Sequence, residues 1–255
     1  MTSLSSAPRT GLAHVAYRLG ERAAARGLDW PLVELRDPAA LEAVIEDLEV
    51  LVISGLWRNE LLDRAPRLRF IQSISAGVDQ YDSQVLASHG IRLASAQGAN
   101  ANAVSEHGMA LILAIVRRIP EAVQNQGRKV WRGMIGDLSQ REDELGGKTL
   151  LVVGIGRIGA RLAHMCQAAL DMKVYAYDPY VSQEAMAARG ITRVETVDEL
   201  MPVADFVSIH TPLTAATRGI IGARQFDLMK RSAYLINTSR GPVVDEAALI
   251  EALRE

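Results

Sequence analysis

The sequence predicts an α/β protein built from two parallel-sheet domains, and three observations lead to that prediction. Short apolar runs alternate with helical segments in both halves of the chain. A turn with the pattern G-x-G-x-x-G occupies residues 154–159, directly after the apolar run 149–153. Between the halves, residues 102–119 form a long apolar-periodic segment, which is predicted to be a helical spine. Alternating strands and helices imply parallel sheets that are covered on both faces.

The first half is expected to hold short strands separated by helices. The predicted strands cover residues 13–19, 32–35, 50–54 and 70–74. The predicted helices lie between these strands, one of them rich in Ala and Arg, and the others at 41–48 and 61–65. Pro66 ends the last of these helices. The fourth strand leads into the sequence Ser-Ala-Gly-Val-Asp at 75–79.

The second half repeats this alternation after the spine helix, which Pro120 follows. A polar stretch, 127–147, is predicted to be an extended connection. The predicted strands cover residues 149–153, 173–178, 206–210 and 233–237, and a helix follows at 245–255. The change of character near Gly98 places the domain boundary there, with domains at 1–98 and 99–255.

The glycine-rich turn predicts a dinucleotide-binding βαβ unit, because it joins a strand to an amphipathic helix. Gly154 permits the tight turn, Gly156 lets the backbone approach a pyrophosphate, and Gly159 lets the helix pack close to the strand. The diphosphate is expected at the helix N-terminus. A glycine-rich turn in some other α/β protein is the alternative, which the flanking strand and helix disfavour.

Asp178 indicates which dinucleotide binds. It ends the second strand, 19 residues after Gly159, where a carboxylate accepts hydrogen bonds from ribose hydroxyls. The same carboxylate repels a 2′-phosphate, and Pro179 and Tyr180 follow it instead of arginines. NAD is therefore expected in preference to NADP.

Two further loops follow strands and contain residues typical of an active site: His-Thr-Pro-Leu-Thr at 210–214 and Asn-Thr-Ser-Arg-Gly at 237–241. Ligands of open α/β sheets bind beyond the carboxyl ends of the strands. Arg240 could there clamp a substrate carboxylate and polarise a carbonyl group. His210 is expected to pack or to line the cofactor rather than to transfer protons. Cys166 and His107 are expected to be core residues.

Composition excludes several other classes of protein. Of 255 residues, 49% are hydrophobic and 23% are charged, and the formal net charge is −2. Nucleic acid and anionic membranes are therefore poor candidate partners. The chain has no run of 18 apolar residues and no apolar signal segment, so a cytoplasmic protein that does not span a membrane is expected. No metal ion is expected.

Four motifs together make the chain resemble the D-isomer-specific 2-hydroxyacid dehydrogenases. They are the segments 75–79, 154–159 with Tyr-Asp-Pro at 177–179, 210–214, and Asn-Thr-Ser-Arg-Gly-Pro-Val-Val-Asp-Glu at 237–246. The resemblance implies two doubly wound domains with the active site in the cleft between them. The first is a flavodoxin-like substrate domain, and the second is a Rossmann NAD-binding domain that lacks its last strands. It also implies a homodimer formed through the spine helix and the segment around Trp131.

The resemblance assigns a role to each matching residue. The substrate carboxylate is held by backbone N–H groups of Ala76, Gly77 and Val78, and Arg240 is the catalytic arginine. The cofactor contacts fall on Gly154, Gly156, Arg157, Ile158, Gly159, Asp178, His210, Thr211, Pro212, Thr217, Asn237 and Thr238. The expected reaction interconverts a D-2-hydroxy acid and the 2-oxo acid with NAD.

This sequence departs from the family pattern in two places. Asp171 stands where the family usually has glycine after a helix, and Asp tolerates the left-handed conformation needed there. The family's Glu–His pair, whose His donates the proton, has no counterpart before Glu255. The expectation is therefore a C-terminally truncated or inactive dehydrogenase. A non-catalytic NAD-sensing or partner-binding protein, or an NAD enzyme of another type such as a formate dehydrogenase relative, remains the alternative.

Overall fold

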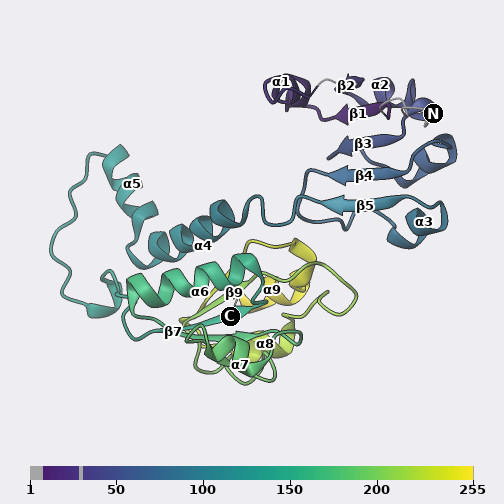
Figure 1. Ribbon diagram of the computed structural model, residues 1–255. Helices are drawn as coiled ribbons and strands as arrows, with labels where there is room; N and C mark the ends of the chain where they lie inside the picture. The colour runs from purple at the N-terminus through teal and green to yellow at the C-terminus, as the bar shows by residue number, and fades with distance from the viewer. Residues whose placement is uncertain (1–7, 29–30, 255) are drawn as a thin grey trace. The chain divides into compact units, whose positions relative to one another are not determined.

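A computed structural model describes residues 8–28 and 31–254, and the chain divides into two compact units, Met1–Ala99 and Asn100–Glu255. Each unit is built around a five-stranded sheet in which every strand pair is parallel (Figure 1). Two parallel sheets with intervening helices confirm the predicted α/β fold class. None of the described helices is long and apolar enough to cross a lipid bilayer.

The N-terminal unit has the strand order β2-β1-β3-β4-β5, which is the flavodoxin-like order. Its strands are β1 (Thr10–Ala13), β2 (Leu32–Leu35), β3 (Val50–Ile53), β4 (Phe70–Ser73) and β5 (Arg92–Ser95). Its helices are α1 (Leu19–Ala24), α2 (Pro38–Glu42) and α3 (Ser83–Ser88), with 3-10 turns η1 (Ile45–Asp47) and η2 (Asn59–Arg64).

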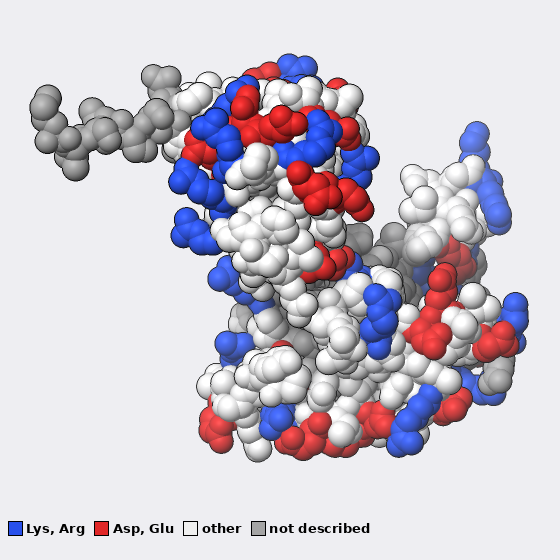
Figure 2. All heavy atoms as spheres, turned by 90° about the vertical axis from the view of Figure 1, so that its right-hand side faces the viewer, with Lys and Arg blue, Asp and Glu red and all other residues white. Residues whose placement is uncertain are grey.

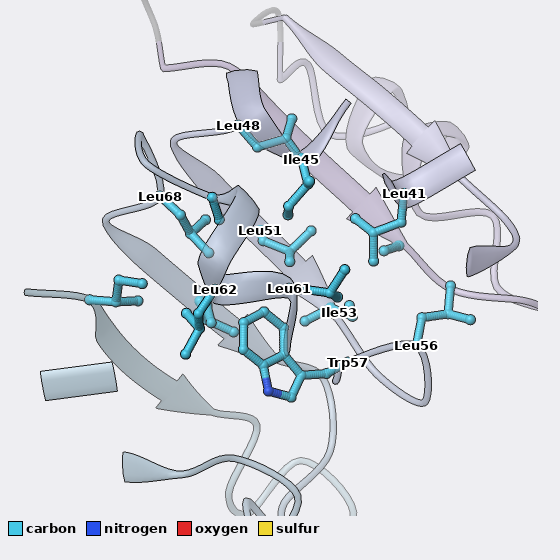
Figure 3. Close-up of a cluster of buried hydrophobic side chains, with 14 of the residues drawn as sticks. Leu41, Ile45, Leu48, Leu51, Ile53, Leu56, Trp57, Leu61, Leu62 and Leu68 are labelled. Atoms are coloured by element: carbon cyan, nitrogen blue, oxygen red, sulfur yellow. The ribbon is translucent and has the colours of Figure 1, made fainter. Parts of the chain in front are cut away.

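Apolar side chains from the strands and from α2, η1 and η2 form the core of this unit (Figure 3). Leu51 and Ile53 alternate along β3 and are fully buried, while Leu41 and Ile45 cover them from the helical side. Trp57 packs against this cluster, and its Nε1 donates to Asn59 Oδ1 at 2.9 Å, so the indole N–H is satisfied. This core holds together the sheet whose carboxyl edge carries the loops after β1 and β4.

Three expectations for this unit are wrong in detail. The first strand covers Thr10–Ala13 rather than 13–19, because the chain turns at His14, whose Nδ1 accepts from the N–H groups of Ala16 and Tyr17. The helix expected at 41–48 is two shorter pieces, α2 and η1. Helix α2 begins earlier than expected because Asp37 caps its N-terminus. Val44 then departs from helical dihedral angles and separates α2 from η1. The helix expected at 61–65 is the 3-10 turn η2.

The C-terminal unit has the strand order β10-β9-β6-β7-β8, the Rossmann arrangement when the strands are numbered from β6. Its strands are β6 (Thr149–Val153), β7 (Lys173–Tyr177), β8 (Thr192–Arg193), β9 (Phe206–Ile209) and β10 (Tyr234–Asn237). Its helices are α4 (Ala101–Val116), α5 (Ile119–Gly127), α6 (Arg157–Leu170), α7 (Gln183–Ala187), α8 (Ala223–Leu228) and α9 (Glu246–Ala252), with 3-10 turns η3 (Leu138–Gln140) and η4 (Gly241–Val243).

Helix α4 packs along α6, and Figure 1 shows the two side by side. Gly108 of α4 faces Leu162, and Glu106 forms an ion pair with Arg161 at 3.2 Å. The predicted spine helix is therefore present, but it ends at Val116 rather than at Ile119. Arg118 adopts a left-handed conformation (φ 50°), and α5 begins at the next residue with Pro120 in its first turn. His107 is exposed, so its assignment to the core was wrong.

Positive and negative side chains are interleaved on the surface, as Figure 2 shows for one face. At the amino ends of the N-terminal sheet, Arg9 pairs with Asp47 at 2.6 Å, and both Arg67 and Arg69 pair with Glu49. Such exposed pairs contribute about 0–1 kcal/mol each.

Candidate functional site

The glycine-rich turn joins β6 to α6 in the middle of the C-terminal sheet. Gly154 has φ 94°, a conformation that other residues rarely adopt, and its N–H donates to Tyr177 O at 2.8 Å. A Cβ on Gly159 would lie 2.1 Å from Gly154 O, so only glycine allows α6 to approach the turn this closely. A Cβ on Gly156 would meet nothing within 4 Å. The turn therefore has two structural glycines, and a third that borders open space.

The N-terminus of α6 is suited to an anion. Gly156 is the N-cap residue, and no side chain caps the helix, although α6 is 14 residues long. Its first N–H groups and the helix dipole thus face the space beside Gly156, with Arg157 exposed and Ile158 half-buried. This geometry fits the pyrophosphate of a dinucleotide.

Asp178 lies next to this turn, at the end of β7. Its Oδ2 accepts from Ile155 N at 3.0 Å, and its Oδ1 accepts from Tyr180 N at 2.9 Å. Each carboxylate oxygen retains capacity for a further hydrogen bond. The carboxylate is thus fixed in place and can still accept from ribose hydroxyls.

The loop after β9 contributes His210 and Thr211. The imidazole of His210 bridges two hydroxyl groups, with Nε2 2.9 Å from Ser208 Oγ and Nδ1 3.2 Å from Thr238 Oγ1. Burial lowers the pKa of His210 to about 4, so the ring is neutral near pH 7. Ser208 was not foreseen as its partner, although it lies two residues earlier on the same face of the strand.

Thr211 carries a buried hydroxyl that has no hydrogen-bond partner among the residues described. Buried polar atoms of this kind are rare and call for an explanation, such as a ligand atom. The hydroxyl of Thr217 instead closes the loop, since it donates to Pro212 O at 2.6 Å and accepts from Thr214 N at 2.9 Å. Thr211 thus fits a cofactor contact, while Thr217 holds the loop in shape.

The loop after β10 presents Arg240, and Asn237 organises it. Asn237 Oδ1 accepts from Ser239 N at 3.0 Å and from Ser239 Oγ at 2.9 Å, while its Nδ2 donates to Arg240 O at 2.9 Å. The guanidinium group is half-buried, and its Nη1 donates to Ser239 O at 2.9 Å. One amide side chain therefore sets the backbone path on both sides of the arginine.

These loops follow four adjacent strands, β10, β9, β6 and β7, and all emerge at the carboxyl edge of the sheet. The structure thus brings together Arg240, His210, the glycine-rich turn and Asp178 at one edge of this unit, in that order. Cys166 lies away from them in the core, where burial raises the pKa of its thiol to about 12. Among the described residues, no group of three or more His, Cys, Asp or Glu side chains is arranged to hold a metal ion.

In the N-terminal unit, the segment Ala76–Gly77–Val78 follows β4 at the corresponding edge of that sheet. The hydroxyl groups of Ser54 and Ser75 lie 2.7 Å apart and join the ends of β3 and β4. Ser75 O accepts from Ala96 N at 3.1 Å, which ties the start of the loop to the end of β5. Within the described part of the chain, the N–H groups of residues 76–78 have no acceptor. They can therefore hold a carboxylate. The Ser54–Ser75 contact was not predicted.

Fold and site together define a dinucleotide-binding protein of the Rossmann class, and the comparisons with known proteins identify the family. The model of the family "D-isomer specific 2-hydroxyacid dehydrogenase, NAD binding domain" matches residues 109–255. The chain belongs to this family, and it carries an NAD-binding domain.

Two curated relatives illustrate the similarity. D-3-phosphoglycerate dehydrogenase of Methanocaldococcus jannaschii is 37% identical over 214 residues, which cover 83% of this chain and 40% of the relative. Glyoxylate reductase of Thermofilum pendens is 36% identical over 233 residues, covering 89% of this chain and 66% of the relative. The chain thus spans about two fifths of the length of the first of these relatives.

Solved structures of dehydrogenases have the same fold as this chain. D-lactate dehydrogenase of Aquifex aeolicus, complexed with NAD and lactic acid, superposes with a TM-score of 0.84 at 29% identity, and the alignment covers 96% of this chain and 73% of that one. A formate dehydrogenase of Granulicella superposes with a TM-score of 0.81 at 26% identity, covering 94% and 65%.

Proposed function

We propose that this protein is an NAD-dependent oxidoreductase that interconverts a D-2-hydroxy acid and the corresponding 2-oxo acid. The observation that carries the proposal is the loop after β10, in which Asn237 fixes the backbone around Arg240 at the edge that holds the dinucleotide-binding features. The curated relatives named above act on 3-phosphoglycerate or glyoxylate by their names, and the structural relative contains lactic acid. All three are small 2-hydroxy or 2-oxo acids.

Residues of the C-terminal unit bind and orient NAD, which supplies or accepts the hydride. Asp178 accepts from the adenosine ribose hydroxyls, and the N–H groups beside Gly156 and Arg157 hold the pyrophosphate. The unpartnered hydroxyl of Thr211 supports a cofactor contact from the β9 loop. The unit Asn100–Glu255 is accordingly the cofactor domain, and the unit Met1–Ala99 the substrate domain.

Each unit carries groups suited to bind the acid: Arg240 in one, and the N–H groups of residues 76–78 in the other. The guanidinium group binds the substrate carboxylate and polarises the C2 carbonyl as negative charge develops on its oxygen. The N–H groups of Ala76, Gly77 and Val78 bind carboxylate oxygens. His210 positions the β9 loop instead of donating the proton, because a ring with a pKa of about 4 is a poor acid source near neutral pH.

The test compares two arginine variants of the purified protein. Arg240→Lys keeps the charge but loses the planar fork, and it should lower kcat/KM for glyoxylate, hydroxypyruvate or pyruvate by a factor equivalent to about 2–4 kcal/mol. Arg254→Lys alters an exposed arginine that pairs with Glu251 on α9, and it should leave the rate unchanged. NADH oxidation is followed by absorbance, and NADH affinity is measured in parallel.

The outcomes separate this proposal from its alternatives. Equal kcat/KM for Arg240→Lys and the parent on every accepted 2-oxo acid would show that the arginine has another role. NADH binding without turnover of any 2-oxo acid would favour an NAD-sensing or partner-binding protein. Turnover of formate with NAD in place of 2-hydroxy acids would favour the formate dehydrogenase relationship.

A further inference from the structure

The chain turns sharply after β1, at residues 14–17, and this turn lies at the same edge of the N-terminal sheet as the loop at 76–78. Ala13 pairs with Ile53 of β3, and Ile53 pairs with Ser73 of β4, so the three strands end level with one another (Figure 1). Neighbouring strands lie about 4.8 Å apart, so the ends of β1 and β4 are about 10 Å apart. A ligand held at 76–78 therefore has the 14–17 turn within reach.

The turn is rigid. His14 Nδ1 accepts from Ala16 N at 2.9 Å and from Tyr17 N at 2.7 Å. The rings of His14 and Tyr17 are stacked, with centroids 4.1 Å apart and an interplanar angle of 5°. His14 thus fixes both the backbone and the aromatic ring of Tyr17 before any ligand binds, which lowers the entropy lost on binding.

The surface that the turn presents is apolar. Val15 is 61% exposed and Tyr17 is 62% exposed, and Val78 of the neighbouring loop is also exposed. Rigid exposed aromatic and aliphatic side chains beside a binding loop are typical of contacts with an apolar ligand group.

The arginines of the loops after β1 and β3 are already ion-paired. Arg18 pairs with Glu21 at 2.8 Å, and Arg58 pairs with Glu42. A phosphate group would have to compete with these two carboxylates for the arginines. A phosphate substituent on the substrate would accordingly find a poor electrostatic match here.

From this geometry we infer that the 14–17 turn is the specificity-determining wall of the substrate site, with Tyr17 and Val15 contacting the substituent on C2. The substrates are 2-hydroxy or 2-oxo acids with an apolar, preferably aromatic, substituent rather than a phosphorylated one. The inference rests on the proposed function, since it places the substrate carboxylate at residues 76–78. A benzyl group bound there extends toward the wall, whereas glyoxylate has no substituent to reach it.

The experiment measures kcat and KM with NADH for phenylpyruvate, glyoxylate and 3-phosphohydroxypyruvate. The parent should use phenylpyruvate at least about tenfold more efficiently than 3-phosphohydroxypyruvate. Tyr17→Ala should lower kcat/KM for phenylpyruvate about tenfold, mainly through KM, and change glyoxylate less than about twofold. Tyr17→Phe should behave like the parent. Val15→Ala should weaken phenylpyruvate binding, whereas Val85→Ala, an exposed valine on α3, should not.

Equal losses for glyoxylate and phenylpyruvate in Tyr17→Ala, or a parent that prefers 3-phosphohydroxypyruvate, would overturn the inference and leave the proposed function intact. A parent that reduces none of the three acids counts against the proposed function instead. In that case, titration of D-phenyllactate and glycolate into the NAD-loaded parent and Tyr17→Ala decides the inference. The inference is supported if D-phenyllactate binds more tightly to the parent than to Tyr17→Ala while glycolate binds equally to both. It is refuted if D-phenyllactate binds equally to both proteins.

Discussion

His210 is the residue whose ionisation this fold perturbs most clearly in the pH range between 4 and 7. Its ring is enclosed between Ser208 and Thr238, and burial lowers its pKa from 6.5 to about 4. The unfolded chain therefore binds a proton more readily than the folded chain between these two values. The contribution of the neutral His210 to the free energy of unfolding is therefore fully present above pH 6.5. It is lost as the pH falls from 6.5 toward 4.

The slope is the testable quantity. The loss should approach about 1.4 kcal/mol per pH unit near pH 5, with a total of roughly 3 kcal/mol by pH 4. Urea unfolding between pH 4.5 and 7.5 measures it. His210→Asn cannot take up the proton and should flatten this part of the profile, even if the variant is less stable at pH 7. The hydrogen bond with Arg224 lowers the pKa of Asp198 from its ordinary value of 3.8. The contribution of such a carboxylate to stability is therefore lost mainly below pH 3.8. A parallel pH profile for parent and variant would contradict the assignment to His210.

Asp178 provides the second prediction at the scale of single residues. Its charge should exclude the 2′-phosphate of NADP, while its oxygen holds the N–H of Ile155 at 3.0 Å. Asp178→Asn keeps that acceptor and removes the charge, so the preference for NADH over NADPH should narrow by about tenfold or more, equivalent to about 1.4 kcal/mol. Asp178→Ser tests the same change with a shorter side chain. Fluorescence titration with both cofactors gives the ratio, and equal affinities in the unmodified protein would refute the expected NAD preference.

At the scale of an element, the junction of β6 and α6 holds two glycines three residues apart that should respond differently to substitution. One should affect mainly stability and the other mainly NADH affinity. A Cβ on Gly159 meets Gly154 O at 2.1 Å, whereas a Cβ on Gly156 meets nothing. Gly159→Ala should thus lower the free energy of unfolding by about 2–3 kcal/mol or more. Gly156→Ala should change stability by no more than about 0.5 kcal/mol but weaken NADH at least about tenfold, since the methyl group enters the space proposed for the pyrophosphate. Urea unfolding and NADH titration of both variants check this, and loss of stability in Gly156→Ala would contradict the assignment.

This junction was also the part of the molecule that the sequence predicted best. The strand, turn and helix lie where the glycine spacing places them, because Gly154 and Gly159 are each required by a local backbone constraint. Asp171 likewise adopts the expected left-handed conformation, with φ 51°, at the end of α6. Local chemistry determines these features, so a single sequence reveals them.

Other elements depend on contacts that a sequence pattern does not contain. Arg118 breaks the spine helix in a left-handed conformation although arginine favours helices, so tertiary structure overrides its propensity. The turn at His14 shortens the first strand through hydrogen bonds that backbone N–H groups donate to the imidazole. In the site, the role of Asn237 in fixing the Arg240 loop and the unpartnered hydroxyl of Thr211 emerge only from atomic positions. The substrate and cofactor roles of individual residues remain predictions.

At the scale of the whole molecule, the expected homodimer is the remaining prediction. In the C-terminal unit, large apolar side chains of the connection after α5 are exposed to solvent. Trp131 is 96% exposed, Met134 103% and Leu138 76%. On α5 itself, Ile119 and Val123 are also exposed. Burial of such side chains is favourable, and contiguous exposed apolar surface marks interaction sites. Tryptophan is among the residues that contribute most to binding energy at interfaces.

We therefore expect two copies to associate through α5 and residues 130–138. Sedimentation velocity at micromolar concentration should give a species of twice 27.7 kDa, about 55 kDa. Trp131→Asp and Met134→Lys should each shift the population toward the monomer, because each places a charge in the interface core. Tyr180→Asp changes a side chain that is 91% exposed after β7, outside this surface, and should leave the dimer intact. A parent that sediments as a 27.7-kDa monomer would refute the dimer, and equal dissociation by all three variants would refute this surface.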